Sequence, residues 1–188
     1  MSEYVVIDDI SNTLLNLLKA NTSGLISSDH ITVSSPSDIM EDASPRIGLF
    51  LYHIGENKHL KNQEMEASEP GKSRYPALPL NLFYLLTAYG QTRETEQQII
   101  GRAMQIFYDH AVIGGSLLQG SLAGTYEEII VTFNPISIED MNKLWSMLGS
   151  KPYRLSVTYQ VSTALIDSTR QRTDDRVIQR TVVYSVTQ

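Results

Sequence analysis

The sequence predicts a single α+β domain, residues 1–188, in which a mixed and mostly antiparallel sheet of about five strands packs against about three helices. Apolar residues recur at helical spacing in separate segments, and runs rich in β-branched and aromatic residues lie between these segments. Of the 188 residues, 41% are hydrophobic and 19% are charged, which is near the average for folded domains. A chain of this length folds around one hydrophobic core.

Helices are expected in three places. In 3–20, apolar residues recur at steps of three and four: Ile7, Ile10, Leu14, Leu17 and Leu18. The segment 91–111 has acids in its first turn, where the helix dipole favours them, followed by an apolar stripe. The third helix begins after Ser137, whose hydroxyl suits an N-cap, and ends before Gly149 and Pro152.

Strands are expected at 30–33, 46–54, 77–89, 126–133, 153–162 and 176–186. The run 46–54 is continuously apolar, which is typical of a strand covered on both faces, and it is positioned to pair with 77–89. The run 153–162 alternates between apolar and polar residues, so one of its faces is expected to be buried.

Three connecting segments lack these patterns. The stretch 55–76 contains hardly any apolar residues and is long for a connection in a compact domain, so we expect a projecting polar loop. The stretch 114–125, GGSLLQGSLAGT, is expected to be flexible and rich in turns. A charged turn is expected over 167–175, before the terminal strand.

The composition excludes several functional classes. The chain has no Cys, which rules out disulfides, thiolate catalysis and Cys-ligated zinc. A net charge of -6 disfavours nucleic-acid binding. No apolar run approaches about 18 residues, and acids stand where a secretory leader carries positive charge. We therefore expect synthesis and assembly in the cytoplasm, with no membrane insertion.

No motif indicates catalysis, a metal or a cofactor. The His residues lack zinc-ligand spacing and are found at His30, His53, His59 and His110. Serines beside glycines do not match the G-x-S-x-G elbow, and there is no Walker or Rossmann glycine pattern. The acidic pairs 8–9, 41–42 and 127–128 would act as catalytic carboxylates only if folding separated their pKa values. We expect no catalytic, metal-binding or cofactor-binding residues.

Two features allow two interpretations each. The strand 176–186 near the end of the chain either completes its own sheet or is donated to the edge of a neighbour's sheet. Trp145, the only tryptophan, lies on the apolar face of the third helix and belongs either to the core or to a subunit interface.

The order of several sequence blocks resembles a known family. RIGLFLYHI is followed by Glu56, Asn57 and Asn62, then by PLPLNLFYLLTAYG, IIGRAMQIFYDH and finally IIVTFNPISIEDMNKLWSMLGSKPYRLSVTYQV. This set resembles the cap, or tail-terminator, family of contractile injection systems, which are phage-tail-like particles. The resemblance covers roughly residues 2–186.

The resemblance implies a non-enzymatic structural protein. It would form a hexameric ring at the end of the particle away from the baseplate, stop polymerisation of the inner tube, and hold the last ring of the contractile sheath. The implied partners are further copies of the chain, the sheath protein and the inner tube protein. The particle would be either released or associated with a membrane after assembly in the cytoplasm.

Partner-binding residues are expected in the polar loop, which is long enough to reach a neighbour or the tube, and in the terminal strand, because such particles link sheath subunits by exchanged strands. These candidates are Asn57, Asn62, Val177, Ile178, Val182, Val183 and Tyr184. Two other functions stay open. One is a small cytosolic hydrolase whose carboxylates gather from separate segments, and the other is a neck or tube-completion protein of a related tail.

Overall fold

The computed structural model describes residues 4–39, 44–61, 66–69, 72–149 and 151–173. Its α-helices are α1 (Val6–Asn21), α2 (Arg93–Asp109) and α3 (Ile138–Met147). Its strands are β1 (Ile31–Val33), β2 (Arg46–Glu56), β3 (Glu66–Glu69), β4 (Lys72–Arg74), β5 (Leu78–Tyr89), β6 (Val112–Gly114), β7 (Glu128–Phe133), β8 (Ser156–Ile166) and β9 (Gln171–Thr173). Three short 3-10 helices are η1 (Ser28–His30), η2 (Gly115–Leu117) and η3 (Gly120–Leu122).

The main sheet has six strands in the order β1-β2-β5-β8-β7-β6. β1 and β2 are parallel, and the other neighbours are antiparallel. The long strands β2, β5 and β8 form its centre, and the expected pairing of 46–54 with 77–89 is confirmed by the β2–β5 register. The predicted α+β class with a mixed, mostly antiparallel sheet is therefore confirmed, with one more strand in this sheet than the approximate count.

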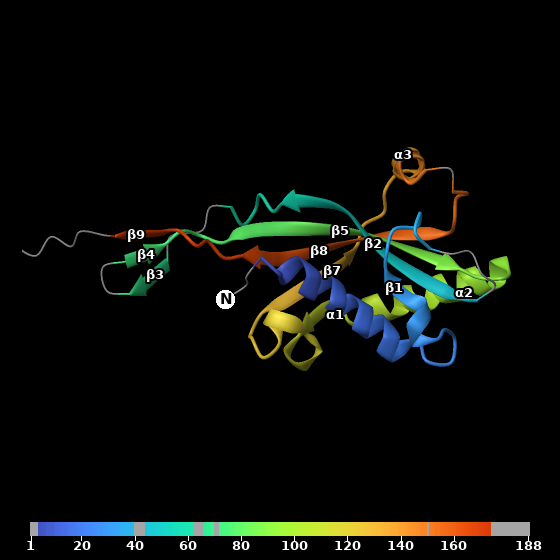
Figure 1. The fold of residues 1–188 in the computed structure, drawn as a ribbon, viewed down its shortest axis with the longest axis horizontal. Helices are drawn as coiled ribbons and strands as arrows, with labels where there is room; N and C mark the ends of the chain where they lie inside the picture. Colours follow the sequence, from blue (N-terminus) through green and yellow to red (C-terminus); the bar gives the residue numbers. More distant parts are fainter. Residues whose placement is uncertain (1–3, 40–43, 62–65, 70–71, 150, 174–188) are drawn as a thin grey trace, which may run out of the picture.

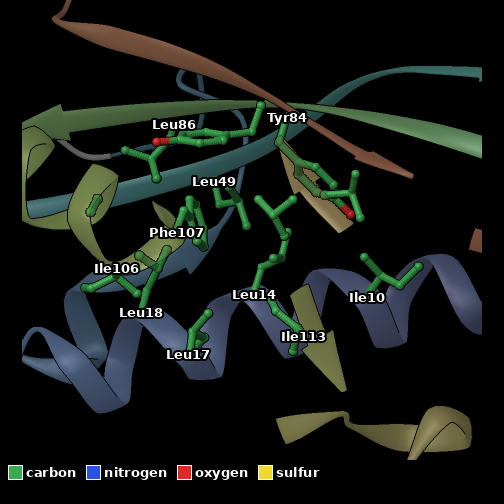
Figure 2. Packing of buried hydrophobic residues seen from close by; sticks show 14 of the residues in the cluster. Ile10, Leu14, Leu17, Leu18, Leu49, Tyr84, Leu86, Ile106, Phe107 and Ile113 are labelled. Carbon is green, nitrogen blue, oxygen red and sulfur yellow. The ribbon is translucent and has the colours of Figure 1, made fainter. Parts of the chain in front are cut away.

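The two faces of this sheet are covered unequally. α1 and α2 lie against one face, and α3 lies against the other (Figure 1). The main core lies between the sheet and the α1–α2 pair, where Ile10, Leu14 and Phe107 meet Tyr84 and Leu86 (Figure 2). The predicted apolar stripes of the first two helices are the faces that build this core.

The α3 face holds a much smaller cluster. Leu85 of β5 packs there against Leu144, Trp145 and Leu148, which come from α3 and its C-terminal end. The expected helix boundaries are confirmed, because the Ser137 hydroxyl accepts a hydrogen bond from the N–H of Asp140 at 3.0 Å. Beyond α3, Gly149 has a φ of +84°, the left-handed conformation that ends helices.

Strand β2 differs from the expectation that both of its faces are covered. Burial is complete only at Ile47, Gly48 and Leu49, whereas His53 and Ile54 are exposed. The helices cover the first half of β2, and the second half runs out beyond them (Figure 1). A continuous apolar run therefore does not imply two covered faces here.

The stretch 55–76, expected as a projecting polar loop, contains strands in the part that the structure describes. β2 continues to Glu56, and β3 and β4 form an antiparallel hairpin. β4 also pairs with β9, which lies inside the expected charged turn 167–175. The cause is the β5–β8 ladder, which runs to Leu78 opposite Ile166 and so brings the two adjoining segments side by side. This second sheet, made of β3, β4 and β9, is called the arm below.

The glycine-rich stretch 114–125 is also more regular than expected. It contains the end of β6 and two 3-10 helices, and α1 holds it in place through hydrogen bonds. The carboxylate of Asp9 accepts from the N–H of Ser121 at 2.9 Å and from its hydroxyl at 2.6 Å. The hydroxyl of Thr13 accepts from the N–H of Gln119 at 3.0 Å. The predicted terminal strand 176–186 lies outside the described residues.

Candidate interaction surfaces

The arm projects from one end of the molecule's longest axis (Figure 1). No side chain of β4 or β9 belongs to either hydrophobic cluster. Small antiparallel sheets depend on a buried apolar face for stability, and all three residues of β9 are exposed. β4 and β9 therefore add nothing to the described core.

The root of the arm is held by polar contacts. The guanidinium of Arg170 lies over the ring of Tyr75, 4.4 Å from its centroid, and the N–H of Tyr75 donates to the carbonyl of Arg170 at 3.3 Å. On the adjoining turn, Lys61 and Glu56 form an ion pair at 3.1 Å, with both side chains solvent-accessible. The contacts between Tyr75 and Arg170 join the segment after β4 to the segment before β9.

Asn57 shapes the turn that follows β2. It is 9% exposed, its N–H donates to the carbonyl of Pro79 at 2.8 Å, and its side-chain oxygen accepts from the N–H of His59 at 3.1 Å. Its own carbonyl accepts from the N–H of Leu60. These contacts are internal, so partner binding by Asn57 stays a prediction.

The other expected partner-binding residues, Asn62, Val177, Ile178, Val182, Val183 and Tyr184, lie outside the described residues.

The second surface is an apolar hollow beside α3, here called the α3 hollow. Its volume is about 690 Å³, and it is lined by Ile136, Ile138, Glu139, Met141, Asn142, Trp145 and Tyr153. Two of its apolar side chains face solvent to a large extent, since Ile138 is 91% exposed and Tyr153 is 54% exposed. Large apolar groups that gather around a recess are typical of interaction sites.

Trp145 forms the floor between this hollow and the sheet. It is 6% exposed, as the core interpretation expects, and its ring meets that of Tyr153 edge to face at 5.4 Å between centroids. Its indole N–H is buried and has no acceptor among the described residues. Buried donors have an acceptor in the large majority of cases, so this N–H is an exception among the described residues.

A buried ion pair, missed from the sequence, joins α2 to the segment before β8. Glu96 is 2% exposed and accepts from Arg154 at 2.9 Å and from Arg93 at 3.1 Å. Glu96 was expected only as a favourable acid in a first helical turn, and Arg154 only as a polar residue of an alternating strand. Nothing in either local pattern connects two positions so far apart in the chain.

The described residues gather no catalytic or metal-binding group. No cluster of three or more His, Asp or Glu in these ranges is arranged to hold a metal ion. Asp9 is occupied by Ser121, and Asp8 accepts from the side chain of Asn12. Nor does any described helix have the length and apolar character needed to cross a membrane.

The family described as the Pvc16 N-terminal domain matches residues 9–180. The fold is similar to that of the sheath/tube terminator of PVC, an extracellular contractile injection system, in its extended state. That match has a TM-score of 0.70 and 20% identity, and covers 97% of this chain and 64% of the other. It is also similar to the tube-terminating cap of the anti-feeding prophage, with a TM-score of 0.64, 19% identity, and coverage of 95% of this chain and 61% of the other.

The chain thus spans a little less than two thirds of the length of these two structures, at 64% and 61%. No curated protein matches it in sequence. The resemblance indicated by the ordered sequence blocks is confirmed, and the chain belongs to the Pvc16 N-terminal domain family.

Proposed function

We propose that the chain is a structural cap of a contractile injection particle, in which a ring of copies ends the inner tube and anchors the last ring of the sheath. The observation that carries this proposal is the match of nearly the whole chain, 97%, to the fold of a sheath/tube terminator. The family match over residues 9–180 supports the same function. Six copies are proposed for the ring, as the sequence resemblance implies.

The surfaces of the molecule suit this role. A ring with rotational symmetry buries one patch of each subunit against a different patch of the next, so it needs two distinct surfaces on one chain. The arm and the α3 hollow are two such surfaces: the strands of the arm and helix α3, which carries much of the hollow's lining, lie toward opposite ends of the molecule (Figure 1). The lining of the α3 hollow includes one carboxylate, that of Glu139, whereas a hydrolase needs several convergent catalytic groups.

The partners proposed are the inner tube protein, the sheath protein and further copies of the chain, without nucleic acid, cofactor or catalytic activity. Assembly would take place in the cytoplasm, on a particle that is later released or held at a membrane. The segment 176–186 would be donated to the sheath, with Val177, Val183 and Tyr184 among its contact residues.

Tube polymerisation tests the proposal. Inner tube protein of the same particle is polymerised with increasing amounts of the chain, and tube lengths and ends are measured by negative-stain microscopy with a gold label on the chain. A cap shortens the tubes and labels one end only. Labelling along the tube walls, or tubes of unchanged length, would contradict the cap function.

A variant lacking 176–188 separates tube binding from sheath binding. Because the proposed strand donation concerns the sheath alone, this variant is expected to end tubes normally and to lose the last sheath ring. Thermal unfolding of the isolated variant is the control. If the variant fails to fold, the segment belongs to its own sheet and strand donation is refuted.

A further inference from the structure

We propose that residues 135–149, which contain α3, form a flap that lifts from the sheet as a unit while the rest of the fold stays intact. This motion belongs to the single chain and needs neither the ring nor the cap function. α3 lies on the opposite face of the sheet from α1 and α2 (Figure 1), so it can leave without disturbing the main core. The open state is a minor population in exchange with the closed one.

Few side chains hold α3 to the sheet. Of its 10 residues only Leu144 and Trp145 are buried, whereas α1 buries eight of 16 residues and α2 buries six of 17. Together with Leu148, which is 9% exposed, these two side chains pack on Leu85 in a cluster that shares no member with the main core. Regions with few buried apolar contacts open at a lower free energy than the core does.

No described polar contact ties α3 to the body. α1 is tied by the hydrogen bonds of Asp9 with Ser121, and α2 by the ion pair of Glu96 with Arg154. The described side-chain hydrogen bonds and ion pairs of α3 stay within the helix and its N-cap: Ser137 with Asp140, Lys143 with Glu139 and Asp140, and Ser146 with the carbonyl of Asn142. Lifting the helix therefore breaks none of these contacts.

Two further features lower the cost of opening. The indole N–H of Trp145 is buried without an acceptor among the described residues, and lifting α3 gives this donor a hydrogen bond to water. The α3 hollow, of about 690 Å³, lies beside the helix and is lined by its residues Met141 and Trp145. On the side of the hollow these side chains lack packing atoms, so less dispersion energy is lost when the helix leaves.

Main-chain hydrogen bonds fix the chain on both sides of the flap. Before it, the N–H of Asn134 donates to the carbonyl of Thr158 at 3.0 Å. After it, the carbonyl of Leu155 accepts from the N–H of Ala88 at 3.2 Å. The sheet therefore keeps its strands when the flap lifts.

Opening uncovers an apolar strip of the sheet. Leu85 is 0% exposed beneath α3, and the partly buried side chains of Phe50 and Tyr52 pack against the same cluster. The open state alone offers this strip to solvent, so a partner that binds it shifts the population toward the open state.

Thiol labelling at two neighbouring positions of β5 tests the flap. Leu85 and Leu86 are both 0% exposed, but Leu85 belongs to the α3 cluster and Leu86 to the main core. The chain has no Cys, so Leu85→Cys and Leu86→Cys each introduce a single thiol, and its rate of reaction with DTNB measures how often that site opens. We expect Leu85→Cys to react at least about a hundredfold faster than Leu86→Cys. Its rate should also rise less steeply with urea, because the flap exposes little surface.

A mild substitution in the main core separates local from global opening. Ile10→Val, at a residue 0% exposed in that core, destabilises the closed and open states equally relative to the unfolded chain. Added to Leu86→Cys, it should raise the labelling rate about two- to tenfold. Added to Leu85→Cys, it should leave the rate unchanged, because the core stays formed while the flap lifts.

Equal labelling rates at the two positions, or an equal effect of Ile10→Val on both, would mean that Leu85 is uncovered only by global unfolding, and would overturn the flap. If either Cys variant fails to fold, native-state hydrogen exchange of the wild-type chain decides. Amides of 138–147 should then exchange in urea concentrations that leave those of 6–21 protected. The same protection and urea dependence in both helices would overturn the flap.

Discussion

Arg154→Ala is expected to be among the most damaging single substitutions outside the hydrophobic clusters. Arg154 is 2.9 Å from Glu96, whose side chain is 2% exposed, and the pair fixes the start of α2 to the chain just before β8. Among the described residues, removing Arg154 leaves the buried carboxylate of Glu96 with Arg93 as its ion-pair partner, and the Arg93 side chain is 77% exposed and therefore weakly held. Breaking a buried pair by removing one partner costs about 3–5 kcal/mol.

The remaining contact with Arg93, and the 26% exposure of the Arg154 side chain, place the expected loss at the lower end, about 3 kcal/mol. For a chain of this size that lowers Tm by about 6–12 °C. Urea unfolding followed by the fluorescence of Trp145, the only tryptophan, measures the free energy of unfolding. Arg93→Ala is the control, with an expected loss below about 1 kcal/mol because its side chain is exposed.

The buried ion pair also determines the expected stability of a variant that lacks both Glu96 and Arg154. Glu96→Leu/Arg154→Leu removes both charges, so it should recover much of the stability that Arg154→Ala loses, because no buried charge remains unpaired. If Arg154→Ala loses no more stability than Arg93→Ala, or if the double variant is less stable than Arg154→Ala, the ion pair does not hold α2 in place as argued.

Three further perturbations test other parts of the structure. Trp145→Ala should lower the free energy of unfolding by about 3–5 kcal/mol, measured by circular dichroism in urea; a much smaller loss with abolished ring assembly would instead assign Trp145 to the interface. Burial raises the pKa of Tyr84 to about 12 and does the same for Tyr159. Because the folded state then favours the neutral phenols, their contribution is complete below pH of about 10 and is lost as pH rises toward about 12. Urea midpoints should fall over that interval, and a flat profile would contradict the burial of these phenols. Gly120→Ala should destabilise the fold, because φ is +61° and a Cβ would lie 1.8 Å from Oδ1 of Asp9; Gly124→Ala, with φ of +76° but nothing within 4 Å, is the matched control and should lose less stability in thermal unfolding.

The sequence predicts those elements that bury one regular face. α1 and α2 could be identified because their apolar stripes form the core around Tyr84 and Phe107. α3 could be bounded because Ser137 and Gly149 act locally, within one helical turn. In such elements, side-chain periodicity and end signals depend on neighbours in sequence, so one chain is enough to recognise them.

The arm could not be predicted from the sequence, because strands β4 and β9 show no regular alternation of buried apolar residues. The strands KSR and QRT contain no apolar alternation, and their register comes from the β5–β8 ladder instead. A strand without a buried face leaves no periodic pattern in the sequence. The α3 hollow likewise depends on Tyr153 and Ile138 meeting in space, which the alternating pattern of 153–162 does not reveal.

Electron cryo-microscopy of the intact particle tests the central claim most directly. If the chain is a cap, the particle should show a ring of this fold at the end away from the baseplate, in contact with the last tube ring and the last sheath ring. Particles whose tube end lacks the chain, or in which the chain lies at the baseplate, would contradict the cap function.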